Sequence, residues 1–225
     1  MDRLRFFFDW SEVWAPIIPL LVLPLRPKQP VFLRPVIIYL FAGIFINLAS
    51  DIIADYKKYF PSWLQSNTVL YNIHSIVRFG CFSSFFILLT QTFYSSQKKI
   101  LPLFYLVFLL INFTFSEKFF NPNSLSGNLL AAEAFLLLIY CLLYYLSQLK
   151  DDVEVLTSGA GFWVVTGISI YVVINFYVFL FYVPMLTENM RLADNMWDIH
   201  DVAYIILCIF IAKAFYEPVR NYARI

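Results

Sequence analysis

The chain has 225 residues, of which 61% are hydrophobic, 20% are aromatic and 14% are charged. Soluble domains carry about 25% charged residues, so this composition excludes an ordinary soluble domain and indicates a protein that crosses a lipid bilayer. The formal net charge is +1, and the sequence has no basic tail and no RNA-binding motif, so nucleic acid is not expected as a partner. The length accommodates a single domain of roughly six to eight spans.

Seven apolar segments predict an all-α fold, a bundle of seven transmembrane helices that forms one domain over residues 1–225. The first segment contains Pro16, Pro19 and Pro24, and we expect a kinked or partly broken helix because proline interrupts a helix. Pro102 is expected to open the fourth span, where its missing amide donor costs little. The expected spans cover residues 10–25, 31–53, 69–94, 100–116, 128–149, 162–186 and 197–217.

The distribution of lysine and arginine predicts the orientation of the bundle. Alternate ends of the expected spans collect these residues on two sides, and the richer side should face the cytoplasm. This places the N-terminus outside and the C-terminus in the cytoplasm. The poorer side holds Arg3, Arg5, Lys57, Lys58, Lys118 and Arg191, and the richer side holds Arg26, Lys28, Arg34, Lys98, Lys99, Lys150, Lys213, Arg220 and Arg224.

The third expected span contains two ionisable residues, His74 and Arg78, which share one face of a helix because they are four residues apart. A rise of 1.5 Å per residue places Arg78 roughly 13 Å below the outer surface. An unpaired charge at that depth costs at least ~3 kcal/mol, so other helices must supply partners. Either Glu133 or Asp201 neutralises Arg78 in a purely structural ion pair, or Arg78 belongs to a ligand site.

Polar residues gather in the outer half of the expected bundle, while the inner half is apolar. Intramembrane polar residues face the bundle interior or a water-filled cavity, so we expect a polar pocket that opens outward. Four carboxylates accompany one arginine there, and charge balance requires protonation of some of them, a cation or a ligand. The predicted pocket residues are Asn47, Asp51, His74, Arg78, Asn112, Glu133, Tyr171, Asn175, Asp198, His200, Asp201 and Tyr204.

The two histidines are few for a metal or cofactor site, and neither a metal nor a cofactor is expected. A zinc hydrolase needs three or four ligands, for which His74, His200, Asp201 and Glu133 are the candidates. Seven-helix hydrolases related to alkaline ceramidases and adiponectin receptors use three histidines, two of them on the last helix, where this chain has only His200. Lys213 lies too near the end of the last span for a retinal lysine and resembles a snorkelling anchor. Haem held by the two histidines is a further alternative, but no pocket-forming glycines accompany them.

Three short motifs carry a resemblance to other proteins. These are Tyr-Asn-Ile-His at Tyr71–His74, Phe-Trp-Val-Val-Thr-Gly at Phe162–Gly167, and Trp-x-x-His at Trp197–His200. With the order of the helices, they resemble a group of small uncharacterised bacterial seven-helix membrane proteins. The resemblance implies a multi-pass protein of the inner (plasma) membrane that acts as a stand-alone sensor or an accessory subunit.

Two classes of function remain open at this point. The first is a signal-input or small-ligand binding protein, whose outer pocket is read by a cytoplasmic or membrane partner protein. The second is a membrane enzyme, of the metal-dependent hydrolase type, or a transporter that acts on a lipid or small solute. The uninterrupted apolar inner half offers no polar route for a transported solute and favours the first class.

Overall fold

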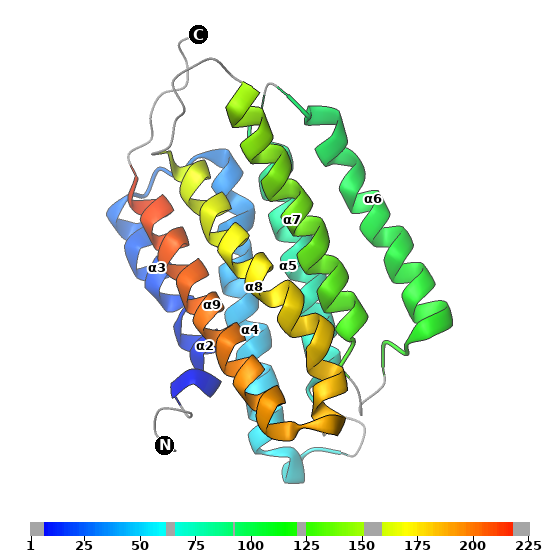
Figure 1. The fold of residues 1–225 in the computed structure, drawn as a ribbon. Coiled ribbons are helices and arrows are strands. Elements are labelled where there is room, and N and C mark those ends of the chain that lie inside the picture. Colours follow the sequence, from blue (N-terminus) through cyan, green and yellow to red (C-terminus); the bar gives the residue numbers. More distant parts are fainter. Residues whose placement is uncertain (1–6, 62–65, 92, 121–124, 151–158, 218–225) are drawn as a thin grey trace.

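The computed structural model describes residues 7–61, 66–91, 93–120, 125–150 and 159–217, which form helices and connecting turns with no strand among them. The expected all-α class is therefore confirmed. The long helices lie side by side along a common axis (Figure 1). Within the described residues, five segments are long and apolar enough to cross a membrane: Val31–Asp55, Ser95–Ser116, Gly127–Lys150, Ala160–Glu188 and Met190–Tyr216.

Six long helices build the bundle, and two short ones precede them in the described chain. The short helices are α2 (Ser11–Trp14) and α3 (Ile17–Val22), and the long ones are α4 (Arg34–Asp55), α5 (Thr68–Leu88), α6 (Ser95–Ile111), α7 (Gly127–Lys150), α8 (Ala160–Glu188) and α9 (Met190–Tyr216). A π-helical turn at Asn112–Ser116 extends α6. The first apolar segment is broken as expected, because α2 and α3 are separated at Ala15 and Pro16.

The predicted end of the third span, residue 94, is wrong. Helix α5 ends at Leu88, and the connection to α6 passes through Tyr94, whose φ of 62° lies in the left-handed region. The Nζ atom of Lys98 donates a hydrogen bond of 2.5 Å to the carbonyl of Leu89. This side-chain contact satisfies a backbone acceptor just beyond the end of α5.

The sequence predicted that Pro102 opens the fourth helix, and this is wrong. Pro102 lies inside α6, which begins at Ser95. A proline has no N–H to donate to the carbonyl four residues earlier, which here belongs to Lys98. The hydroxyl of Tyr140 on α7 donates to that carbonyl over 2.8 Å. A neighbouring helix thus replaces the hydrogen bond that the proline removes.

The predicted start of the last span, residue 197, is also wrong, because α9 begins at Met190. The side chain of Asn189 accepts a hydrogen bond of 3.1 Å from the backbone N–H of Leu192 and so caps the helix. Only this one residue separates α8 from α9. The residues after Asn189 are largely polar, so the hydropathy of the sequence does not indicate that a helix begins there.

Helices α8 and α9 pack along most of their length, and α7 packs on the other side of α8. The close approach of α8 and α9 requires Gly167, because a Cβ atom there would lie 2.7 Å from the Cβ of Phe210 on α9. Helix α5 packs against α4, α6 and α7, and α6 lies at the edge of the bundle (Figure 1). The outer face of α6 is apolar, with Leu103 and Phe104 about 60% exposed.

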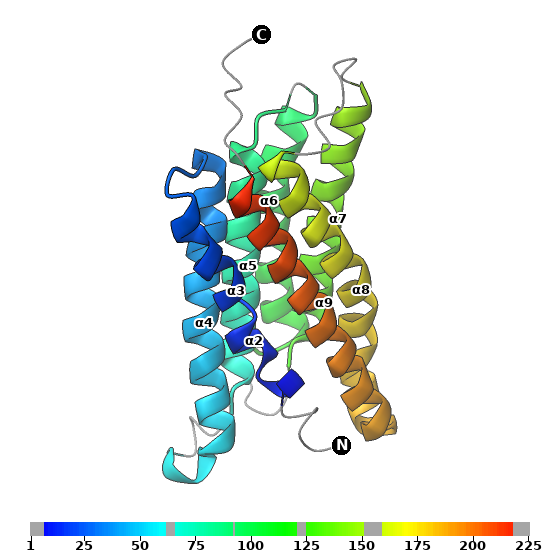
Figure 2. The same cartoon turned by 90° about the vertical axis from the view of Figure 1, so that its left-hand side faces the viewer.

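The short helices α2 and α3 lie against α4 and α9 (Figure 2). Ala15 between them is fully buried, and Ser11 and Glu12 on α2 are also buried. The broken first segment therefore brings a carboxylate into contact with the core of the bundle. Arg3, Arg5, Arg220 and Arg224, which contributed to the predicted orientation, lie outside the described residues.

Candidate functional site

Arg78 on α5 and Glu133 on α7 form a buried ion pair with two hydrogen bonds. The guanidinium Nε lies 2.5 Å from Oε1 of Glu133, and Nη2 lies 2.8 Å from Oε2. The hydroxyl of Ser75 donates to the same Oε2 over 2.6 Å, and Nη1 of Arg78 donates to the Tyr171 hydroxyl over 2.6 Å. Of the two partners that the sequence left open for Arg78, the structure selects Glu133 and not Asp201.

His200 on α9 forms a second buried network, with Asn175 on α8 and Glu12 on α2. The amide Nδ2 of Asn175 donates to the backbone carbonyl of Tyr171 over 2.9 Å, so its Oδ1 is the atom that faces Nδ1 of His200 at 2.6 Å. Because an amide oxygen only accepts, Nδ1 carries a proton. The opposite nitrogen, Nε2, lies 3.0 Å from Oε1 of Glu12.

That second contact requires a further proton between the imidazole and the carboxylate, since Nε2 or the carboxyl group must donate. With the proton on either atom, Glu12 and His200 together are neutral as a pair. Both side chains are almost fully buried, with 7% of Glu12 and 2% of His200 exposed. The pair therefore joins the broken first segment to α9 without leaving a net charge in the core.

His74 lies in a third buried cluster, beside α4 and α9. Its ring is parallel to that of Tyr39, with the centroids 5.9 Å apart. A Cβ atom on Gly43 would lie 3.5 Å from Nε2 of His74 and 3.7 Å from the hydroxyl of Tyr204. His74 is 2% exposed, and its Nε2 forms no hydrogen bond with any described residue.

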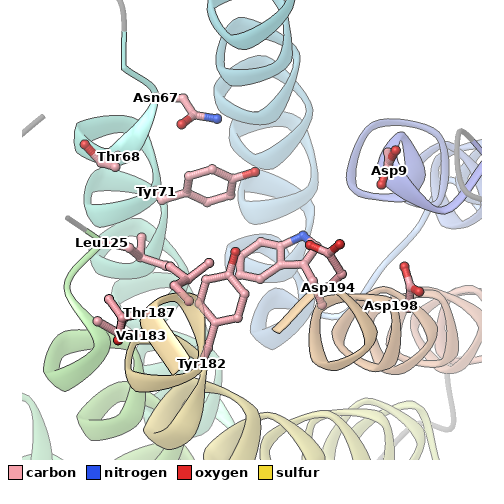
Figure 3. Close-up of a pocket in the computed structure, with 12 residues that line it drawn as sticks. Asp9, Asn67, Thr68, Tyr71, Leu125, Tyr182, Val183, Thr187, Asp194 and Asp198 are labelled. Carbon is pink, nitrogen blue, oxygen red and sulfur yellow. The ribbon is translucent and has the colours of Figure 1, made fainter. Parts of the chain in front are cut away.

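A pocket of about 670 Å³ opens at the end of the bundle where α8 turns into α9 (Figure 3). Ligand pockets in proteins have volumes of roughly 300–1,000 Å³, so this pocket is large enough for a small organic molecule. It is formed by the first turns of α5, the last turns of α8 and the first turns of α9. The lining residues are Asp9, Asn67, Thr68, Tyr71, Leu125, Tyr182, Val183, Leu186, Thr187, Asp194, Trp197 and Asp198.

A smaller cavity of about 10 Å³ lies at the inner boundary of this pocket, and a volume of about 10–15 Å³ holds one water molecule. Tyr71 and Trp197 line both spaces. The remaining lining residues of the small cavity come from the buried networks and the core around them, and they are Glu12, His74, Arg78, Leu130, Phe179 and His200. The large pocket is therefore separated from the buried ionic groups by two aromatic side chains.

The chemical character of the large pocket is aromatic and acidic. The ring of Trp197 lies 4.8 Å from that of Tyr182 and 5.7 Å from that of Tyr71, measured between centroids. Asp9, Asp194 and Asp198 contribute carboxylates, and the described lining includes no lysine, arginine or histidine. The three aspartates lie on the same side of the pocket in Figure 3. The described lining thus brings carboxylates and aromatic rings together.

The structure divides the predicted pocket residues into four groups. Asp198 alone lines the large pocket, and His74, Arg78 and His200 line the small cavity. Asp51 is half-buried on α4 and lines neither space, and Asn112 instead donates to Glu117 over 2.8 Å at the end of α6. Those buried between helices, lining neither space, are Asn47, Glu133, Tyr171, Asn175, Asp201 and Tyr204.

Sequence reasoning missed Glu12, the partner of His200. The signal that could have found it is its position along the chain. Glu12 lies near the start of the first apolar segment, which is expected at the same membrane level as the polar residues at the start of the last segment. The pocket-lining residues Asp9, Tyr71, Tyr182, Asp194 and Trp197 were also missed. Acidic and aromatic residues are ordinary at a membrane boundary, and only packing brings these particular ones around one space.

The four metal-ligand candidates do not form one centre. Glu133 is held by Arg78, and His200 by Glu12 and Asn175, whereas the carboxylate of Asp201 is buried with no hydrogen-bond partner among the described residues. Across the described ranges, no group of three or more His, Cys, Asp or Glu side chains is arranged to hold a metal ion. Glu133 and His200 can therefore be described by their ion pairs and hydrogen bonds alone.

Comparison of the chain with protein-family models, curated proteins and solved structures finds no match in any of the three. The features that bear on function are thus the apolar helices, the buried networks and the pocket above them.

Proposed function

We propose that this protein is a seven-span membrane protein that binds a small ligand in the pocket at the α8–α9 end and transmits its occupancy to a partner protein. The observation that carries the proposal is the position of the pocket, directly above the buried Glu12–His200 network. Its volume of about 670 Å³ is in the range of small-molecule sites. Trp197 is the structural link between the two.

The seven-span count adds two segments to the five long apolar helices. Helix α5 has 21 residues, one fewer than α4, and packs among α4, α6 and α7. The polar residues that form its internal networks also lower its hydropathy. The segment Ser11–Leu25 is apolar but shorter, and it packs against the buried faces of α4 and α9. The lysine and arginine counts support an external pocket and a cytoplasmic C-terminal end.

A route for the signal follows from the ring contacts of Trp197. Its ring lies 4.8 Å from that of Tyr182 at the pocket and 4.9 Å from that of His200 beneath it. His200 in turn contacts Glu12 on α2 and Asn175 on α8. A ligand that moves Trp197 changes the packing of three helices, and a partner on the cytoplasmic side would sense that change. The motif resemblance supports a bacterial inner membrane as the location.

The test is a density map of the purified full chain in lipid nanodiscs. We expect non-protein density in the large pocket, lost in Leu186→Trp, which fills the lining. Met190→Trp is the matched control, because Met190 is 61% exposed and does not line the pocket. A pocket that contains only solvent in the wild-type protein, or a guest that persists in Leu186→Trp, would contradict the proposal.

A further inference from the structure

Asp201 on α9 is a buried carboxylate that the networks described above leave without a partner. It is 1% exposed, and neither of its oxygens forms a hydrogen bond with a described residue. None of the ion pairs among the described residues includes Asp201. An isolated ionised carboxylate is strongly unfavourable in a nonpolar interior, so Asp201 requires a bound cation or a proton.

Asn47 on α4 lies at the same level of the bundle as Asp201. The hydroxyl of Tyr204 lies 3.7 Å from the position that a Cβ atom on Gly43 would take, so α4 and α9 meet at these two residues. The two helices run in opposite directions (Figure 2). Asn47 lies four residues after Gly43, one turn toward the pocket end. Asp201 lies three residues before Tyr204, one turn in the same direction and on the same face of its helix.

Helix α2, which lies between α4 and α9 in Figure 2, brings a further oxygen to this level. Glu12 on α2 contacts His200 on α9, and Ser11 and Asp201 are their immediate neighbours in the sequence. The hydroxyl of Ser11 faces the carboxyl group of Asp201 without the geometry of a hydrogen bond. Ser11 is fully buried, and its hydroxyl has no hydrogen-bond partner among the described residues.

These three side chains offer oxygen atoms of the kind that coordinate hard metal ions. Nδ2 of Asn47 donates to the backbone carbonyl of Glu12 over 3.2 Å, whereas its Oδ1 is buried with no partner among the described residues. Carboxylate and carbonyl oxygens are the preferred ligands of hard cations. We propose that Asp201, Asn47 and Ser11 bind one alkali metal cation, Na⁺ or K⁺, inside the bundle. None of the three lines the large pocket, so the inference does not rest on the function proposed for that pocket.

The charge of the site favours a monovalent ion. One carboxylate balances one positive charge, and a divalent ion would leave a net charge at membrane depth, which is costly. The neighbouring carboxylate of Glu12 is already balanced, because Glu12 and His200 are neutral as a pair. A proton would also neutralise Asp201, but it can be donated to only one acceptor. A metal ion contacts all three side chains at once.

The experiment measures thermal unfolding of the purified full chain in lipid nanodiscs. NaCl, KCl and N-methyl-D-glucamine chloride are compared at one constant ionic strength, and MgCl₂ and CaCl₂ are the divalent probes. We expect Na⁺ or K⁺ to raise the unfolding temperature in a saturable way. The rise should be roughly 3–6 °C when the cation is present at about ten times its dissociation constant.

Asp201→Asn should abolish the response to the cation. In N-methyl-D-glucamine chloride alone this variant should unfold at or above the wild-type temperature, because it removes an uncompensated buried charge. Ser11→Ala removes one neutral ligand and should weaken the apparent affinity about 3–10-fold. Asp55→Asn is the charge-matched control and should keep the full response, since Asp55 is exposed on α4.

Three results would overturn the inference. Equal unfolding temperatures in the three monovalent salts, up to ~0.3 M, would show that Asp201 holds a proton and not a metal ion. A response to Na⁺ or K⁺ that persists in Asp201→Asn would place the ion elsewhere. A larger response to Mg²⁺ or Ca²⁺ that is lost in Asp201→Asn would contradict the monovalent charge. The proposed function fails separately, through a large pocket that contains only solvent in the density map.

Discussion

Arg78 and Glu133 meet in a bidentate ion pair, with Nε to Oε1 at 2.5 Å and Nη2 to Oε2 at 2.8 Å. The side chains are 3% and 2% exposed. Breaking a buried pair by removing one partner leaves an uncompensated charge, whereas replacing both partners with apolar residues is often neutral. The pair therefore explains why an arginine is tolerated near the expected midplane of the bundle.

Either single substitution of this pair should be more harmful than the double one. Arg78→Met or Glu133→Leu should each destabilise the fold by about 3–5 kcal/mol, and the double variant should recover most of that loss. Arg78→Lys should be intermediate because lysine keeps the charge but loses the fork. Unfolding of the purified variants in detergent checks this, and additive single effects would show that the two residues do not act as a pair.

Glu12 should be replaceable by glutamine but not by leucine. Because Nδ1 of His200 donates to Asn175, a neutral His200 offers Nε2 as an acceptor, and the amide of glutamine can donate to it. Glu12→Gln should thus lose at most about 1 kcal/mol, while Glu12→Leu should lose about 1–3 kcal/mol through an unsatisfied buried group. Glu188→Gln, at an exposed site, is the control for the charge change. Equal losses in both Glu12 variants would contradict the proton assignment.

Gly167 and Gly80 should respond in opposite ways to alanine. A Cβ atom at Gly167 would lie 2.7 Å from that of Phe210, whereas none of the described atoms approaches within 4 Å of one at Gly80. Gly167→Ala should cost about 1–3 kcal/mol through overpacking, and Gly80→Ala should be neutral or stabilise the helix by up to about 1 kcal/mol. Thermal unfolding of the two variants side by side measures the difference. A stabilising Gly167→Ala would show that α8 and α9 are not this close.

Tyr140 and Pro102 should be coupled through the carbonyl of Lys98. Tyr140→Phe removes the hydroxyl that donates to that carbonyl and should cost about 1–3 kcal/mol. Pro102→Ala restores a backbone N–H in position to donate to it, so the double variant should be more stable than Tyr140→Phe alone. A double-mutant cycle measures the coupling, and a coupling near zero would mean that the hydroxyl contributes nothing to α6.

The proposed orientation predicts which end of the bundle is accessible from outside the cell. Single cysteines at Glu188 and at Lys99 occupy exposed positions at the pocket end and at the opposite end, respectively. A membrane-impermeant maleimide should label Glu188→Cys in intact cells and should label Lys99→Cys only after permeabilisation. The parent chain with Cys81 replaced by serine is the control, because Cys141 and Cys208 are buried. The reverse pattern of labelling would invert the orientation.

The sequence alone determined the fold class, because long apolar segments in this number have few alternatives to membrane helices. It also predicted that the first segment would break at its prolines, and that Arg78 would need a carboxylate, since both follow from local chemistry. It misplaced the starts of α6 and α9 for a common reason. Pro102 and the polar residues after Asn189 are poor local signals for a helix. In α6 the Tyr140 hydroxyl donates a hydrogen bond to the backbone, and in α9 the Asn189 side chain accepts one from it.

The partners themselves were decided only by tertiary structure. In the sequence, Glu133 and Asp201 are equivalent candidates for Arg78, and nothing singles out Glu12 as a partner of His200. The packing of α5 on α7 and of α2 on α9 assigns Glu133 to Arg78 and Glu12 to His200. The pocket was even less predictable from the sequence than these partners. Its rings and carboxylates come from separate elements, each of them ordinary at a membrane boundary, and they surround one space only because α8 turns directly into α9.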